Sequence, residues 1–181
     1  RDPRTTQPLQ LASVAIDGRK LEIIPNSVFQ SYIRPILTPD ACAAYGITQP
    51  QEEALNVNKI TMEQLVNAPT IEVVWPQFCD YVNQYNSKKN KFTAPIFAGY
   101  NSFRFDEIIV NRICGGQKNY SQCEKEPYKL GPWDDEQKLF HPRDSIDIMK
   151  YVWLFTENNQ DVKSISFDSV REMFGITKTA A

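Results

Sequence analysis

The sequence predicts an α/β domain in which antiparallel strands come first and strand-to-helix units follow. Residues 9–16 form an apolar run that is typical of a mostly buried strand, and the dipeptide Asp17-Gly18 directly after it favours a hairpin. Residues 93–98 form a second apolar run, which a polar turn separates from an acidic helix start at Asp106. Functional residues of α/β proteins concentrate at such strand ends, so this turn is the first place to look for a site.

Length and charge limit the possible classes of protein. With 181 residues, of which 41% are hydrophobic, residues 1–181 can bury a substantial core and are expected to form one domain. The net charge of -2 argues against broad electrostatic wrapping of duplex nucleic acid. The apolar runs are shorter than the roughly 18 residues of a membrane span, and the first residues lack a signal-peptide pattern. We therefore expect a soluble, cytoplasmic protein without a membrane partner.

The first third of the chain predicts a meander of three antiparallel strands. The hairpin partner of residues 9–16 is expected within residues 20–24, and residues 28–33 are expected to form a third strand.

Two helices are predicted in the second third. Thr61 and Gln64 have the spacing of a capping box, which predicts a short helix starting at Thr61. A longer helix should follow Thr70, with Pro76 marking a kink or its first turn. Its apolar stripe is expected to pack in the core and comprises Ile71, Val74, Trp75, Phe78 and Val82.

The cysteines and the histidine predict no zinc site, because no Cys-x-x-Cys pair is present and the chain has one histidine, His141. Cys79 is expected to be a small core residue. The four cysteines are Cys42, Cys79, Cys114 and Cys123.

Two polar stretches allow alternative interpretations. The basic residues 87–91 are typical of a solvated turn but could also contact a phosphate backbone. Residues 114–141 lack periodicity, and a loop of that length is often functional. Its Tyr120, Tyr128 and Trp133 could stack on unpaired bases, or the loop could be an insertion packed over a helix end.

The C-terminal third predicts two more helical segments. Ile146, Met149, Val152 and Trp153 make an apolar helical face within residues 142–153, whose acidic residues could line a site. Residues 167–174 predict a short helix stopped by Gly175.

Residues 99–106 read Gly-Tyr-Asn-Ser-Phe-Arg-Phe-Asp. This stretch resembles the second motif, Gly-His/Tyr-Asn-x-x-Phe-Asp, of the DEDD (DnaQ-like, DEDDh) superfamily of 3′–5′ exonucleases, and its Tyr-Asn-x-x-Arg-Phe-Asp form is most similar to bacterial exonuclease I. The Ala-Pro segment at residues 68–69, residues 142–153 and the Phe-Gly-Ile helix end match the family in the same order.

The resemblance implies a ribonuclease H-like fold: a mixed five-stranded sheet flanked by helices. It implies metal-dependent 3′–5′ exonuclease activity on single-stranded DNA or RNA, with two Mg²⁺ or Mn²⁺ ions and Asp106 as metal ligand. Asp144 is expected to support the site. A polymerase or single-strand-binding protein is a possible partner. The residues expected to shape the turn and to bind the terminal nucleotide are Tyr100, Asn101, Phe103 and Phe105.

Two family motifs do not appear in residues 1–181: an Asp-x-Glu before the first strand and a His-x-x-x-x-Asp after the last helix. Residues 1–181 alone are therefore expected to be inactive, because one aspartate cannot hold two ions. The alternative is a non-catalytic, exonuclease-derived module that binds nucleic acid or a polymerase. In that case the charge of Asp106 only interacts favourably with the helix dipole, Phe105 fills the core and Asn101 caps the turn.

Overall fold

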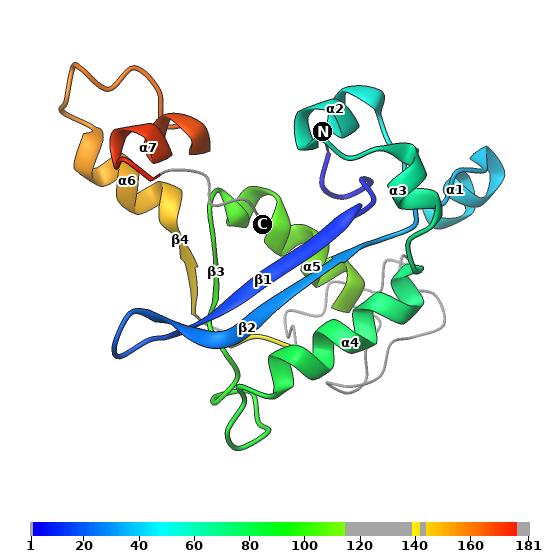
Figure 1. Ribbon diagram of the computed structural model, residues 1–181, viewed down its shortest axis with the longest axis horizontal. Helices are drawn as coiled ribbons and strands as arrows, with labels where there is room; N and C mark the ends of the chain where they lie inside the picture. Colours follow the sequence, from blue (N-terminus) through cyan, green and yellow to red (C-terminus); the bar gives the residue numbers. More distant parts are fainter. Residues whose placement is uncertain (1, 115–138, 142–143, 177–181) are drawn as a thin grey trace.

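The computed structural model describes residues 2–114, 139–141 and 144–176, which form two small sheets with helices around them (Figure 1). The strands are β1 (Gln10–Asp17), β2 (Glu22–Tyr32), β3 (Phe97–Gly99) and β4 (Ser145–Asp147). The helices are α1 (Pro39–Tyr45), α2 (Glu52–Asn58), α3 (Met62–Val66), α4 (Ile71–Asn83), η1 (Ser102–Arg104), α5 (Asp106–Cys114), α6 (Ile148–Thr156) and α7 (Phe167–Met173).

The first third holds two strands instead of the predicted three. β1 pairs with β2 in antiparallel orientation, and the predicted strands at 20–24 and 28–33 are parts of one strand. The break that the sequence suggested is a bulge, because Asn26 takes a left-handed conformation with φ 58°. The hydroxyl of Ser27 then accepts from the amide of Ala15 and donates to its carbonyl, both at 3.2 Å. These bonds hold the strands together where the regular ladder is interrupted.

The predicted five-stranded sheet is not formed by the described residues. They contain two separate two-stranded sheets, β1–β2 and β3–β4. β3 and β4 are parallel, with Gly99 opposite Asp147, and each has three residues: β4 leads directly into α6, and β3 leads through a turn into η1. The fold is mixed α/β as expected, but the regular sheet is smaller than predicted. Because the pair is parallel, the C-terminal ends of β3 and β4 lie at the same edge, where the turn at Tyr100 begins.

Helix α4 is the longer helix that the sequence predicts after Thr70, and its predicted apolar stripe is buried. Pro76 lies inside the helix and not in its first turn. Trp75 is fully buried, its ring centroid 5.6 Å from that of Phe78, and Phe78 in turn lies 5.3 Å from Phe29 of β2. Both α4 aromatics are therefore core residues, as predicted, and they join the helix to the inner face of the hairpin.

The same core reaches the other sheet. Phe97 of β3 packs against this cluster, and its ring centroid lies 4.9 Å from that of buried Phe140. Ile109 and Ile113 place one face of α5 in the cluster, and Cys79 is buried there as predicted. One apolar cluster thus positions α5 against both sheets, which fixes the direction in which its first residue, Asp106, leaves the turn.

Two short helices have the caps that the sequence predicts. Thr61 and Gln64 form the capping box at the start of α3. Beyond α7, Gly175 takes the left-handed conformation that stops the helix, with φ 65°.

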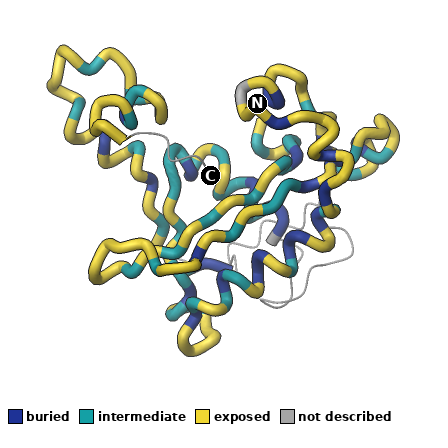
Figure 2. The backbone as a smooth tube through the Cα atoms, viewed as in Figure 1, coloured by how far each residue is buried: buried dark blue, intermediate teal, exposed yellow. Residues whose placement is uncertain are grey.

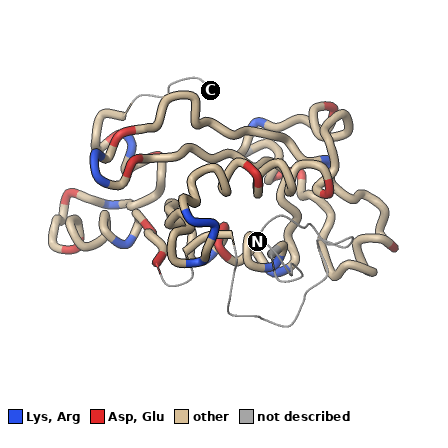
Figure 3. Tube along the Cα trace, turned by 90° about the horizontal axis from the view of Figure 1, so that it is seen from below, with Lys and Arg blue, Asp and Glu red and all other residues tan. Residues whose placement is uncertain are grey.

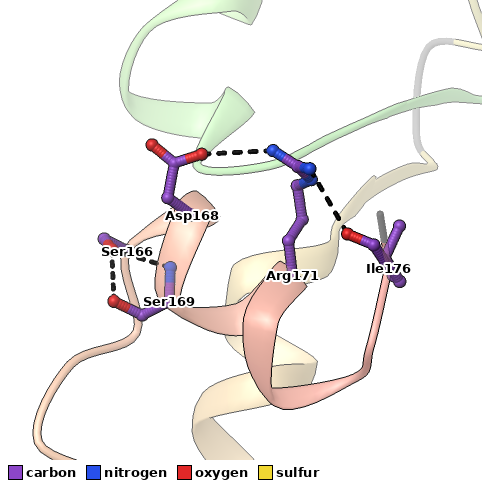
Figure 4. Close-up of polar contacts among 5 residues, drawn as sticks. All are labelled: Ser166, Asp168, Ser169, Arg171 and Ile176. Carbon is purple, nitrogen blue, oxygen red and sulfur yellow. Dashed lines mark hydrogen bonds and ion pairs between the residues drawn. The ribbon is translucent and has the colours of Figure 1, made fainter. Parts of the chain in front are cut away.

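Helix α7 is closed at both ends by its own polar residues (Figure 4). The hydroxyl of Ser166 accepts from the amide of Ser169 at 3.2 Å and lies 2.7 Å from its hydroxyl oxygen. Arg171 pairs with Asp168 at 3.2 Å and donates to the carbonyl of Ile176 at 3.3 Å. The bonds to the amide of Ser169 and to the carbonyl of Ile176 supply partners for backbone groups near the two ends of a helix too short to be stable by propensity alone.

The N-terminal segment is attached to α5 through a buried arginine. Arg112 donates from Nη1 to the carbonyl of Pro3 at 2.9 Å and from Nη2 to the carbonyl of Thr6. A hydrogen bond from a charged donor is stronger than a neutral one, so residues 3–6 are held against the last turns of the helix.

Exposed residues recur along both strands of the β1–β2 hairpin (Figure 2), and several of them are apolar. Val14 pairs with Val28 and Ile16 with Ile23, and these residues are 40 to 71% exposed. Alternation along β1 places Leu11 on the other face, against the core. No helix within the described ranges has the length and apolar character needed to cross a membrane.

Candidate functional site

The turn between β3 and α5 is tightly built, which explains two of its residues. Asn101 has φ 57°, a left-handed conformation that asparagine tolerates better than most residues. A Cβ on Gly99 would lie 2.7 Å from the Cβ of fully buried Ser102, so this position requires glycine. The chain then passes through η1 and starts α5 at Asp106.

A buried carboxylate on the neighbouring strand holds this turn. Asp147 ends β4 and is 4% exposed. Its Oδ1 accepts from the amides of Asn101 at 2.8 Å and Met149 at 3.1 Å, and its Oδ2 lies 3.4 Å from the amide of Phe103. Asp147 is thus the N-cap of α6 and the acceptor for the turn at once, which ties two strand ends together.

Asp106 lies where the sequence predicts it, at the first position of α5. The residue is exposed, yet protein atoms crowd its carboxyl group, and this desolvation is the main cause that raises its pKa. The charge of Asp147 raises it further, against a backbone hydrogen bond at Asp106 itself that lowers it. Burial and Asp147 also raise the pKa of Glu107, the next residue. The start of α5 therefore gathers negative charge that a cation would relieve.

The predicted nucleotide-binding side chains divide into two groups. Phe105 is partly buried and packs against the main core, so its structural role is clear. Tyr100 donates from its hydroxyl to the carbonyl of Ile165, and its ring lies 5.3 Å from that of Phe167. Phe103 lies under the ammonium of Lys150, 3.9 Å from Nζ to the ring centroid. Tyr100 and Phe103 thus link the turn to α7 and α6.

Asp144, which the sequence suggested as a supporting residue, lies beside His141. Its carboxylate is 62% exposed and lies 3.1 Å from Nδ1 of His141, and its backbone amide also contacts His141. The carboxylate that contacts the turn is that of Asp147, in the same Asp-Ser-Ile-Asp segment. Its signal in the sequence was its place at the end of the short strand 145–147, before a helical pattern.

The described residues do not complete a metal centre. No three His, Cys, Asp or Glu side chains among them are grouped as a metal site requires. Asp106 is available, whereas the oxygens of Asp147 already accept backbone hydrogen bonds. A divalent ion at Asp106 would therefore take its other ligands from water, from substrate phosphates or from residues outside those described.

The remaining nucleic-acid candidates are not part of this arrangement. The basic residues 87–91 precede β3 and lie toward its N-terminal end, away from the turn (Figure 1). Acidic and basic residues are interspersed along the described trace (Figure 3). Tyr120, Tyr128 and Trp133 fall outside the described residues, as does Cys123.

The fold is similar to that of solved nuclease structures. No protein-family model matches the sequence, and no curated protein matches it. Among solved structures the chain is similar to cell-death related nuclease 4 (CRN-4), with a TM-score of 0.58 at 12% identity over 93% of this chain and 48% of that one.

Two further structures agree. A 3′-exonuclease that recognises the 3′ end of the histone mRNA stem-loop matches with a TM-score of 0.56 at 17% identity, over 96% of this chain and 48% of that one. E. coli exonuclease I, solved with a dT13 oligonucleotide, matches with a TM-score of 0.56 at 17% identity, over 97% of this chain and 33% of that one. The chain has the fold of these nucleases and spans half of their length or less.

Proposed function

We propose that this chain is part of a metal-dependent 3′–5′ exonuclease of the DEDD superfamily that removes nucleotides from the 3′ end of single-stranded DNA or RNA. The observation that carries the proposal is the exonuclease-type turn of residues 99–106 in a nuclease fold, with Asp106 presented at the start of α5. The Tyr-Asn-x-x-Arg-Phe-Asp form favours an enzyme of the exonuclease I type. An acidic strand end beside a parallel strand pair also suits catalysis in an α/β fold.

Asp106 is the residue proposed to bind Mg²⁺ or Mn²⁺. Bound divalent ions would supply an activated water and would stabilise the leaving 3′ oxygen. This chain contributes the carboxylate, the rigid turn and the surface around it. Asp147 fixes the direction of the turn through its backbone bonds, and its charge makes the surroundings of Asp106 favourable for a cation.

The proposal is supported by the electrostatics of Asp106 as well as by its place in the fold. A carboxylate that only interacted with the helix dipole would be more stable without a second carboxylate nearby, because that neighbour raises its pKa. The pKa of Asp106 is raised by burial and by Asp147, a combination that recurs at functional sites.

The test is the trimming of 5′-labelled oligo(dT) and oligo(U) by the intact protein, with Mg²⁺, with Mn²⁺ and with EDTA. Wild type should produce a ladder that shortens from the 3′ end in either metal and none in EDTA. Asp106→Asn should reduce the rate by more than the roughly 10–100-fold typical of residues that only support metal ligands.

Asp144→Asn is the matched control, because it makes the same chemical change at an exposed carboxylate on the His141 side. It should stay within about threefold of wild type, since exposed ion pairs have small effects. Wild-type activity in Asp106→Asn would contradict the proposal. Tight strand binding without trimming by wild type would instead favour a non-catalytic binding module.

A further inference from the structure

We propose that Lys150 binds a backbone phosphate of the strand whose 3′ end lies at Asp106, and that the ring of Phe103 holds the ammonium in place for this contact. The inference deepens the proposed function and rests on it for the position of the strand. Lys150 lies on the first turn of α6, outside the turn of residues 99–106.

The backbone around Lys150 and Phe103 is fixed by one side chain. Asp147 caps α6 through the amide of Met149, and the same carboxylate contacts the amides of Asn101 and Phe103. The helix that carries the lysine and the turn that carries the ring are therefore positioned relative to each other. In this arrangement Nζ of Lys150 lies 3.9 Å from the ring centroid of Phe103, within the range of a cation–π contact.

The carboxyl groups near the turn favour a positive charge at the position of Lys150. Asp147 acts on the carboxyl groups of both Asp106 and Glu107 and raises the pKa of each, so the surroundings of the turn are acidic. Lys150 lies within electrostatic range of Glu107, where its charge lowers the pKa of that residue against the effect of burial. A positive charge here reduces the repulsion that a nucleic-acid strand would otherwise meet.

The geometry favours a phosphate over a base as the ligand. The ammonium occupies one face of Phe103, so that face is not open for a base to stack on. Lys150 is exposed, and its ammonium carries three N–H donors. The ring of Phe103 lies on one side of the ammonium, so other donors can reach solvent or a ligand. A lysine acts as a point charge toward phosphate, and one held by a ring has less freedom to lose on binding.

The experiment measures the binding of a fluorescein-labelled dT oligonucleotide to the intact protein at several salt concentrations. All variants carry Asp106→Asn, so that the strand is not degraded. Lys150→Gln should weaken binding several-fold and reduce the slope of log K against log salt by about 0.7, the value of one single-strand phosphate contact. Lys150→Arg should restore most of the slope.

Three further variants separate the phosphate contact from other effects. Lys20→Gln removes a charge from the exposed hairpin turn and should change neither affinity nor slope. Phe103→Leu keeps the lysine charge, so it should lower affinity with little change in slope. Arg104→Gln tests the exposed arginine of η1. If Lys150→Gln behaves like Lys20→Gln, or if Arg104→Gln alone changes the slope, the assignment to Lys150 is wrong.

This result is distinguishable from a failure of the proposed function. A wild-type protein that trims oligonucleotides while Lys150→Gln binds them normally would overturn the phosphate contact alone. A protein that does not trim, but loses the predicted slope in Lys150→Gln, would retain the contact and lose the hydrolytic role.

Discussion

Replacing Asp147 with alanine tests the main support of the site. The substitution removes the acceptor for the amides of Asn101, at 2.8 Å, and Met149, at 3.1 Å, and leaves both donors beside a small apolar side chain. The contact with the amide of Phe103 is longer, at 3.4 Å, and should contribute little. The turn at Asn101 and the start of α6 should loosen together, because one side chain serves both.

The magnitude follows from these two bonds. A hydrogen bond to a charged group contributes about 1.5–3 kcal/mol, and an N-cap substitution by alanine costs about 1 kcal/mol. Removing the charge of Asp147 also relieves its repulsion of Asp106 and Glu107, which offsets part of the loss. We expect the free energy of unfolding to fall by about 2–4 kcal/mol. For a protein of this size that lowers Tm by about 4–16 °C.

Denaturant unfolding of the intact protein, followed by tryptophan fluorescence and circular dichroism, measures this loss. Asp144→Ala is the control within the same segment and should cost less than about 1 kcal/mol, because Asp144 is an exposed partner of His141. If Asp147→Ala unfolds within 0.5 kcal/mol of wild type, on the order of a surface substitution, the buried carboxylate does not hold the turn.

Two further predictions concern the turn itself. Asp106 has a raised pKa in the folded protein, so its stabilising contribution is present below the unfolded pKa of about 3.9 and is lost as pH rises through the folded pKa. In thermal scans at pH 7, the Tm of Asp106→Asn should therefore equal or exceed that of wild type. Any difference should disappear at acid pH. A lower Tm of the variant at pH 7 would contradict the pKa shift. Gly99→Ala should lower the free energy of unfolding by about 1–3 kcal/mol in denaturant titrations, because its Cβ would lie 2.7 Å from that of Ser102, and an unchanged midpoint would show that the turn can yield.

The sequence predicted best the features that depend on local patterns. The stripe of α4, the capping box at Thr61 and the helix stop at Gly175 are each set by residues a few positions apart, and the structure confirms all three. Asp106 was also found locally, because a strand, a turn and a helix start follow one another in residues 93–113.

The errors arose where pairing between distant segments decides the structure. The break after residue 24 is a bulge in one strand, and the bonds between Ser27 and Ala15 that hold the strands together there join residues 12 positions apart, beyond a short sequence window. The supporting role of Asp144 stays a prediction, and the register of β4 against β3, which a short sequence window does not contain, is what places Asp147 opposite Gly99. The contact of Lys150 with Phe103 likewise depends on the packing of α6 beside the turn, which the sequence does not reveal.

The bonds of Arg112 to Pro3 and Thr6 have a mechanical consequence for the site. Arg112 lies in the last turns of α5, and Asp106 begins the same helix. Ile109 and Ile113 also hold this helix in the main core, and Asp147 holds the turn before Asp106, so the helix is supported along its whole length. Loss of the Arg112 bonds should therefore release residues 3–6 first and leave Asp106 in place.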